Sequence, residues 1–375
     1  MRPLKILRIL PLGYLNLVEA YIKSIPNFKE LSYQEQKISL IKYAPAHVNS
    51  FSECMRNLGH ECDEILFDLE CNRKKWASEN KASFNDHSWK FDTMMEQIIA
   101  YKPDVIYMQG HNFFPYWIRI RLKEIVPSLK KIVIYTGFPG KSSDFKDIDH
   151  IFCCIPSIQK GFQDAGCQSS LVYYYFDQNV HNNINLTHLE QDIDCSFLGT
   201  SGYGGHWQAH ISRYQLLDEL AKHSNIQMWL NEGSKFIVPE VEDYRPLREK
   251  YPNLTHSPRT GLDMYKILGE SKVTINRHTN AANGDVGNMR MFEATGMGTC
   301  LLNDKGNNLS DIFEDDKEIV TYSSSDECIE KLTYLHNNPK VAKVIACAGQ
   351  KRTLSEHSLQ KRCEQLSHTI QSLFN

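Results

Sequence analysis

Asn276 to Asp304, NRHTNAANGDVGNMRMFEATGMGTCLLND, is the stretch of sequence that decides the fold. The apolar residues 273–275 lead into it as the end of a strand, and a polar loop rich in Gly and Asn follows. A helix is predicted over 287–295, and after the Gly296–Gly298 turn the apolar run 299–303 indicates a second strand. An α/β sheet uses this order of elements to present the N-terminus of a helix to an anionic ligand.

Ionisable side chains are dense in this stretch. Asp285 and Glu293 are separated by seven residues, and Arg277, His278 and Arg290 lie around them. Because charged groups beside buried strands are rarely there for packing alone, this cluster indicates a site rather than a surface.

The rest of the chain alternates strand-like and helix-like segments. Strands are predicted at 4–10, 63–67, 105–108, 131–135, 150–154, 171–175, 195–198, 226–230, 272–276, 299–303 and 318–322. Helices are predicted at 44–58, 88–101, 117–126, 210–223, 261–270, 287–295, 325–337, 341–355 and 358–373. This rhythm predicts an α/β protein with doubly wound, mostly parallel sheets covered by helices on both faces.

A chain of 375 residues is too long for one ordinary core. The polar, Asn-rich residues 177–193 are the best candidate linker. We therefore expect an N-terminal domain over 1–180, a C-terminal domain over 190–357 and a final amphipathic helix over 358–375. The default binding site is the cleft at the carboxyl ends of the two sheets.

Composition narrows the class of protein further. The formal net charge of −3 argues against a nucleic-acid partner. The eleven cysteines include no CxxC pair, which argues against a disulfide framework or a zinc cage and favours a reducing cytosol. The sequence has no uncharged run long enough to span a membrane, and its first residues lack the features of a secretion signal.

Three segments carry a family resemblance: NRH at 276–278, NMRMFEATGMG at 288–298 and LLND at 301–304. They resemble the C-terminal domain of CgeB-like glycosyltransferases of the GT-B fold, near the glycosyl transferases group 1 family, and the resemblance covers about residues 190–365. It implies two Rossmann-like domains that face a central cleft, with the C-terminal helix packing back on the N-terminal domain. It also implies that the C-terminal domain binds the nucleotide-sugar donor and the N-terminal domain binds the acceptor.

The resemblance also implies roles for the two carboxylates. Glu293 would bind the ribose hydroxyls of the nucleotide, and Asp285 would lie near the donor sugar. Retaining members of the wider group carry this acidic pair, usually with Glu at the first position, where this chain has the shorter Asp.

The departing diphosphate needs positive charge and N–H donors. Backbone N–H groups of Gly287, Asn288 and Met289 suit phosphate oxygens at a helix start, and Arg290 and Arg277 can add bidentate contacts. Three alternatives remain open at this point. Arg290 can instead pair with Asp285 or Glu293, Arg277 can reach solvent, and His278 can cap the strand–loop junction rather than touch the donor.

A second Gly-rich segment begins with Gly199, Thr200 and Ser201 after the strand at 195–198. We expect it to form a loop that approaches a phosphate or a sugar, with a flexible surface turn as the alternative. Arg213 in the following helix is a further candidate for the diphosphate.

In the N-terminal half, loops after strands are expected to hold the acceptor. Gly13 and Tyr14 follow the first strand and Gly137 follows the strand at 131–135. His111 follows the strand at 105–108, where it can bind the donor sugar or act as a base. The alternative for His111 is a hydrogen bond to local backbone.

We therefore expect an enzyme, a hexosyltransferase-like glycosyltransferase with Asp285, Arg290 and His111 as its catalytic candidates. It would need no metal or other cofactor, and its acceptor would be a glycan, lipid, protein or small molecule, with peripheral membrane association left open. Two alternatives stand beside this hypothesis: a non-catalytic sugar- or nucleotide-binding structural protein of the CgeB type, and a sugar-nucleotide epimerase of the GT-B fold.

Overall fold

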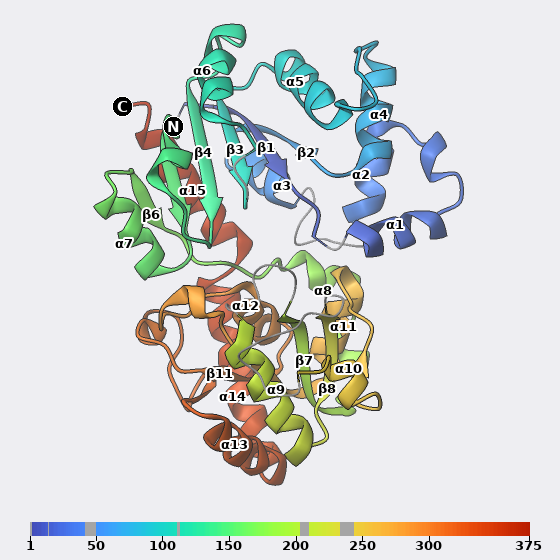
Figure 1. Cartoon of the computed structure of the whole chain (residues 1–375), viewed down its shortest axis with the longest axis vertical. Helices are drawn as coiled ribbons and strands as arrows, with labels where there is room; N and C mark the ends of the chain where they lie inside the picture. Colours follow the sequence, from blue (N-terminus) through green and yellow to red (C-terminus); the bar gives the residue numbers. More distant parts are fainter. Residues whose placement is uncertain (1, 14, 42–49, 111–112, 203–209, 233–243) are drawn as a thin grey trace. The chain divides into compact units, whose positions relative to one another are not determined.

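The computed structural model describes residues 2–13, 15–41, 50–110, 113–202, 210–232 and 244–375. Within it the chain forms two compact units (Figure 1). One unit combines Met1–Tyr173 with the C-terminal segment Leu359–Asn375, and the other is Tyr174–Ser358. Each unit has its own six-stranded parallel sheet.

The sheet of the N-terminal unit has the strand order β2-β1-β3-β4-β5-β6. Apolar residues fill β1, β3 and β4, which are buried along most of their length, as parallel strands with helices on both faces must be. The strands are β1 Lys5–Leu10, β2 Glu61–Leu66, β3 Val105–Gln109, β4 Lys131–Thr136, β5 His150–Cys153 and β6 Ser169–Leu171.

Helices of the N-terminal unit connect these strands. They are α1 Leu15–Ser24, α2 Tyr33–Ile41, α3 Ser50–Asn57, α4 Glu70–Glu79, α5 Trp89–Tyr101, α6 Tyr116–Ile125 and α7 Pro156–Asp164. Of these, α1, α2, α4 and α7 were not predicted from the sequence. The predicted helix at 44–58 is described only from Ser50 onward.

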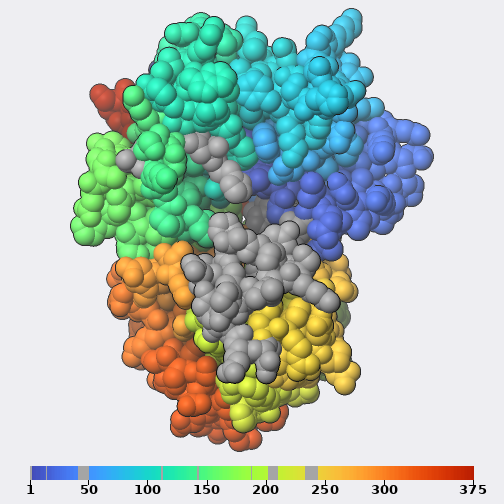
Figure 2. All heavy atoms as spheres, in the orientation of Figure 1, coloured from blue at the N-terminus to red at the C-terminus, as the bar shows by residue number. Residues whose placement is uncertain are grey.

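The last helix, α15 (Leu359–Ser372), belongs to the N-terminal unit, which confirms the expected return of the C-terminus. Ser367 Oγ lies 2.7 Å from His60 Nε2, and the Arg362 Nε–H donates to the Tyr173 carbonyl at 2.9 Å. In the space-filling view the red end of the chain lies against atoms of this unit (Figure 2).

The sheet of the C-terminal unit has the strand order β12-β11-β10-β7-β8-β9. Its strands are β7 Ile193–Gly202, β8 Gln227–Glu232, β9 Thr255–His256, β10 Ser271–Asn276, β11 Cys300–Asp304 and β12 Val320–Tyr322. Along the chain, β8 and β9 join the sheet on one side of β7, and β10 then pairs with the other side of β7. This reversal is the topological switch point at which open α/β sheets bind ligands.

The helices of the C-terminal unit are α8 Asn179–Asn183, α9 Ile211–His223, α10 Leu247–Lys250, α11 Gly261–Glu270, α12 Met289–Gly296, α13 Ser325–Asn337 and α14 Pro339–Glu356. Two glycines allow close packing around α12 and α14. A Cβ on Gly349 would lie 2.2 Å from the Glu318 carbonyl oxygen, and one on Gly296 would lie 2.3 Å from the Phe176 ring.

Three local expectations need correction. The polar segment 177–193 is not a linker, because the two units divide at Tyr173/Tyr174 and the segment forms α8 and a short 3-10 helix inside the C-terminal unit. The strand predicted at 171–175 ends at Leu171 as β6. Gly199, Thr200 and Ser201 lie within β7 rather than in a loop, since β7 continues to pair with β8 as far as Gly202.

Two further properties bear on the class of protein. None of the eleven cysteines, all of which lie in the described ranges, forms a disulfide. Across the described residues, no helix combines the length and the apolar character that crossing a bilayer requires.

Candidate functional site

The candidate site lies at the carboxyl ends of β10 and β11 in the C-terminal unit. These strands are parallel neighbours, and their register pairs Asn276 with Asn303. Parallel strands end at the same edge of a sheet, so the residues after Asn276 meet the residues around Asp304 although they are far apart in sequence.

His278 joins these two strand ends to the start of α12. Its backbone N–H and its Nδ1 lie 3.0 and 2.8 Å from Asp304 Oδ1. Its Nε2 accepts hydrogen bonds from the backbone N–H groups of Gly287 and Asn288, at 3.0 and 3.1 Å. Of the two possibilities raised for His278, the structure therefore shows the capping of the strand–loop junction.

This arrangement corrects one expectation about phosphate binding. The N–H groups of Gly287 and Asn288 are directed at His278, so in this structure they are not presented to a ligand. Gly287 has a φ of 145°, which a residue with a side chain rarely adopts. Gly287 thus shapes the turn into α12, and Met289 begins the helix itself.

Asparagine side chains hold the helix start in place. Asn276 and Asn288 exchange two amide hydrogen bonds, both 3.0 Å long. The Asn276 Nδ2–H also donates to Asn303 Oδ1 at 2.6 Å, and the Tyr322 hydroxyl donates to the Asn276 carbonyl at 2.7 Å. Because all four residues are satisfied by one another, the N-terminus of α12 is fixed against the ends of β10, β11 and β12.

Asp285 is held by contacts between its own loop and the loop that contains Asn307 and Asn308. Asn308 exchanges two hydrogen bonds of 2.8 Å with the backbone of Val286. Asn307 Nδ2–H donates to Asp285 Oδ1 at 3.3 Å, and Asp285 is 7% exposed. A Cβ on Gly306 would lie 2.4 Å from Val286, so only glycine lets these loops approach this closely.

Two arginines bring positive charge to this edge of the sheet. Arg290 Nη1 lies 2.8 Å from Glu293 Oε2, so the ion pair raised as an alternative from the sequence is present. Arg277 Nη1 lies 3.8 Å from Asp304 Oδ2. The Nε atoms of both arginines are buried and lack a hydrogen-bond partner among the residues that the structure describes. Buried N–H donors of this kind have hydrogen-bonding capacity that an anionic ligand can satisfy.

The carboxylates of the site affect their neighbours. Burial, and then the charges of Glu293 and Asp177, raise the pKa of the Tyr265 hydroxyl well above its ordinary value. Burial opposes ionisation of Asp304, but the interactions with His278 and with Arg277 outweigh it and lower the pKa of Asp304. Asp304 therefore stays ionised while it accepts from His278.

Arg213 and Ser201, which were expected to approach a phosphate or a sugar, form hydrogen bonds with other parts of the protein instead. Arg213 donates from Nη1 to the Thr200 carbonyl at 3.0 Å and from Nε to the Arg277 carbonyl at 3.1 Å. The Ser201 hydroxyl donates to Glu232 Oε1 at 2.9 Å. Arg213 thus ties the end of β7 to the end of β10, and Gly199 is a position inside the strand.

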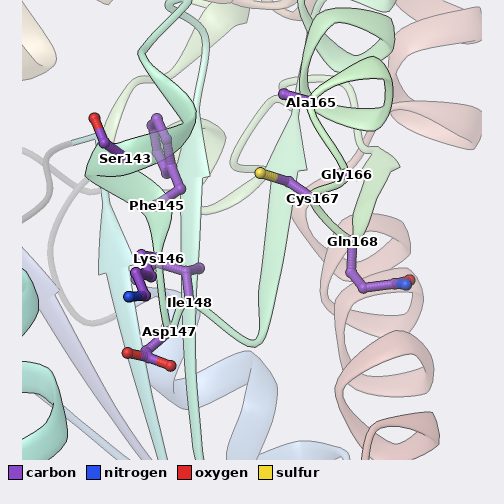
Figure 3. Close-up of a pocket in the computed structure, with 9 residues that line it drawn as sticks. All are labelled: Ser143, Phe145, Lys146, Asp147, Ile148, Ala165, Gly166, Cys167 and Gln168. Carbon is purple, nitrogen blue, oxygen red and sulfur yellow. The ribbon is translucent and has the colours of Figure 1, made fainter.

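The N-terminal unit contains the positions expected to meet the acceptor. Gly13 follows β1 and Gly137 follows β4, both at the carboxyl edge of their sheet. Tyr14 and His111 lie outside the described residues. A pocket of about 460 Å³ in this unit is lined by residues that precede β5 and β6, among them Phe145, Lys146 and Cys167 (Figure 3). It opens at the amino edge of the sheet, opposite to the expected acceptor loops.

Sequence reasoning missed the asparagines 276, 303, 307 and 308 as organisers of the site, and it missed Glu232. A signal was present for the first two. Both predicted strands, 272–276 and 299–303, end in Asn followed by a charged residue, and a parallel register would bring the two asparagines together. Glu232 accepts from Ser201 and from the backbone N–H groups of Leu247 and Arg248, contacts that no local pattern indicates.

Residues 200–368 match the glycosyl transferase-like family. This match includes the ends of β10 and β11, the start of α12 and the residues that contact them. No curated protein sequence matches the chain significantly.

Several solved structures are similar in fold to this chain. HepE from Anabaena in complex with UDP-glucose is 12% identical over 98% of this chain and 100% of that chain, with a TM-score of 0.59. A glycosyltransferase from Rickettsia africae is 11% identical over 100% of both chains, with a TM-score of 0.58. Sucrose-phosphate synthase from Thermosynechococcus elongatus is 10% identical over 99% of both chains, with a TM-score of 0.55. The chain therefore has the GT-B fold.

Proposed function

We propose that this protein is a glycosyltransferase that moves a sugar from a nucleoside-diphosphate sugar to an acceptor, within the CgeB-like branch of GT-B enzymes. One observation carries the proposal. Arg277 and Arg290 place buried Nε–H donors, without a partner in the described part of the chain, at the switch point of the C-terminal sheet. A diphosphate has the charge and the oxygen geometry that two guanidinium groups recognise.

The proposed roles are supported by the positions of the two arginines and by the family resemblance. Arg290 and Arg277 stabilise the negative charge that develops on the departing diphosphate. Glu293 accepts hydrogen bonds from the ribose hydroxyls, and Asp285 lies towards the donor sugar. The bound UDP-glucose of HepE, a protein with the same fold, supports a nucleotide sugar as the donor class.

The transfer is proposed to need no metal, because the two arginines supply the positive charge that a metal would otherwise provide. Activity should then persist in EDTA, whereas loss of activity in EDTA and its recovery with Mg²⁺ or Mn²⁺ would contradict this part of the proposal. The spacing Asp285-x7-Glu293 supports retention at the anomeric carbon. Gly13, Tyr14 and Gly137 remain the proposed acceptor side, and His111 remains a proposed base or donor-sugar ligand. The absence of disulfides supports a reducing compartment such as the cytosol.

A panel of nucleotide sugars tests the proposal. Thermal unfolding of the full chain would be followed with UDP-glucose, UDP-N-acetylglucosamine, GDP-mannose, dTDP-glucose and ADP-glucose. A ligand that binds only the folded state raises the unfolding temperature. We expect one nucleotide class to do so in a concentration-dependent way, and no shift with any of them would contradict a nucleotide-sugar site.

A further inference from the structure

His278 has hydrogen-bond partners that define its protonation state. Nε2 accepts from two backbone N–H groups, Gly287 at 3.0 Å and Asn288 at 3.1 Å, so it carries no proton. Nδ1 lies 2.8 Å from Asp304 Oδ1 and must donate to that carboxylate, so it carries the proton. The partners thus assign a neutral imidazole in the Nδ1–H tautomer, buried between β11 and the start of α12.

We infer that His278 is a positioning residue of the donor site, and that only its neutral Nδ1–H form holds the start of α12 where Arg290 and Glu293 can meet a nucleotide sugar. This inference rests on the proposed function and adds a requirement to it. His278 does not touch the ligand; it fixes Gly287 and Asn288, the two residues that lead into Met289 and Arg290.

Protonation of His278 would break this arrangement. A proton on Nε2 would put an N–H group opposite two N–H donors about 3 Å away, so two attractive contacts would become repulsive. The turn at Gly287 and Asn288 would then have to move. Asp304 favours the imidazolium, whereas Arg277 opposes it, and both lie at the same strand ends. The other charged side chains on these elements and their adjoining loops are Lys272, Asp285, Arg290, Glu293 and Lys305.

Two conservative variants separate the two sides of the imidazole. His278→Gln can keep an acceptor where Nε2 lies, and its amide does not titrate. His278→Asn can reach Asp304 but leaves the N–H groups of Gly287 and Asn288 without their acceptor. A merely structural role would make both variants equally poor or equally good, whereas a positioning role ranks them.

The binding test uses UDP-glucose and calorimetry on the full chain at neutral pH. His278→Gln should bind within a few-fold of wild type, because its amide oxygen can still accept from Gly287 and Asn288. His278→Asn should bind roughly tenfold more weakly than wild type, because those two N–H groups lose their acceptor. Thermal unfolding of each variant checks that it is folded.

Nitrogen NMR of the ¹⁵N-histidine-labelled chain tests the tautomer without any ligand. The signals of His278 are those lost in His278→Gln. We expect a pyrrole-type Nδ1 and a pyridine-type Nε2 at neutral pH. An imidazolium or the Nε2–H tautomer would overturn the inference, as would equal affinities of His278→Gln and His278→Asn for UDP-glucose. If wild type binds no nucleotide sugar, the proposed function fails, and a pyridine-type Nε2 would still support the bridge to α12.

Discussion

Arg290 and Glu293 form an ion pair in the first turns of α12, with Arg290 Nη1 2.8 Å from Glu293 Oε2. Their side chains are 15% and 5% exposed, so the pair is largely removed from water. The pair occupies one side of the guanidinium and leaves the buried Nε without a partner among the described residues. The same arginine can therefore orient the carboxylate and receive an anion.

Arg290→Ala should weaken nucleotide-sugar binding by roughly tenfold or more, because charge-assisted hydrogen bonds to the diphosphate are lost. Arg290→Lys should fall between wild type and Arg290→Ala, since Lys keeps the charge but not the planar donor geometry. Calorimetry measures both. Arg352→Ala is the matched control, because this arginine of α14 donates to the Ile312 carbonyl and has no place in the proposed site. Unchanged affinity in Arg290→Ala would rule out the diphosphate role.

Glu293→Ala should weaken binding and also lower the free energy of unfolding, since it leaves Arg290 charged and unpaired in a mostly buried position. The double variant Arg290→Ala/Glu293→Ala should be more stable than the sum of the single effects predicts, by about 0.5–3 kcal/mol. Urea unfolding of the four proteins measures this coupling. Strictly additive effects would mean that the ion pair does not link the two residues.

Gly349→Ala should destabilise the C-terminal unit by about 1–3 kcal/mol or more, because the added Cβ would lie 2.2 Å from the Glu318 carbonyl oxygen, which is backbone and cannot turn aside. Gly161→Ala is the control. Gly161 lies inside α7, no atom stands within 4 Å of its added Cβ, and alanine favours helices by about 1 kcal/mol. The unfolding temperature should fall in Gly349→Ala and rise in Gly161→Ala. An unchanged unfolding temperature in Gly349→Ala would show that α14 packs less closely than described.

Asp304 should make stability depend on acid pH. Its folded-state pKa is lowered, because His278 and Arg277 outweigh the opposing effect of burial. Its ionised form therefore stabilises the fold above the ordinary aspartate pKa of about 3.9, and this contribution is lost as pH falls through the lower folded-state pKa. Urea unfolding over a pH series should show a shallower acid limb in Asp304→Asn than in wild type. Equal slopes in the two proteins would contradict the assignment.

Most strands could be predicted from the sequence because they contain short apolar runs, and parallel strands buried on both faces need such runs. The short strands β6, Ser169–Leu171, and β9, Thr255–His256, contain no such run and were not predicted at these positions. Helix α4 could not be predicted either. Its buried residues include Asn72 and Arg73, and Arg73 donates to the Phe67 and Lys90 carbonyls and to Thr93 Oγ1. Apolar periodicity carries no signal for a helix that is held by polar contacts.

The sequence singles out the acidic and basic residues of the candidate site and names Glu293 as one possible partner of Arg290. The other partners could not be predicted. His278 and Asp304 are 26 residues apart and meet only because β10 and β11 are parallel neighbours in one register. Arg213 looked like a phosphate ligand from its charge, whereas its donors reach the Thr200 and Arg277 carbonyls. The residue types indicated an anion-binding site. The strand register determined which of their donors and acceptors already have hydrogen-bond partners within the protein.

The most direct test of the central claim is calorimetric titration of the wild-type chain, Arg290→Ala and Arg352→Ala with the nucleotide sugar that best raises the unfolding temperature. The account predicts saturable binding to wild type and to Arg352→Ala with a dissociation constant between about 1 μM and 1 mM, the usual range for enzyme substrates. It predicts that Arg290→Ala binds this nucleotide sugar at least about tenfold more weakly than wild type does. Equal binding by all three proteins, or no binding to wild type by any member of the panel, would contradict it.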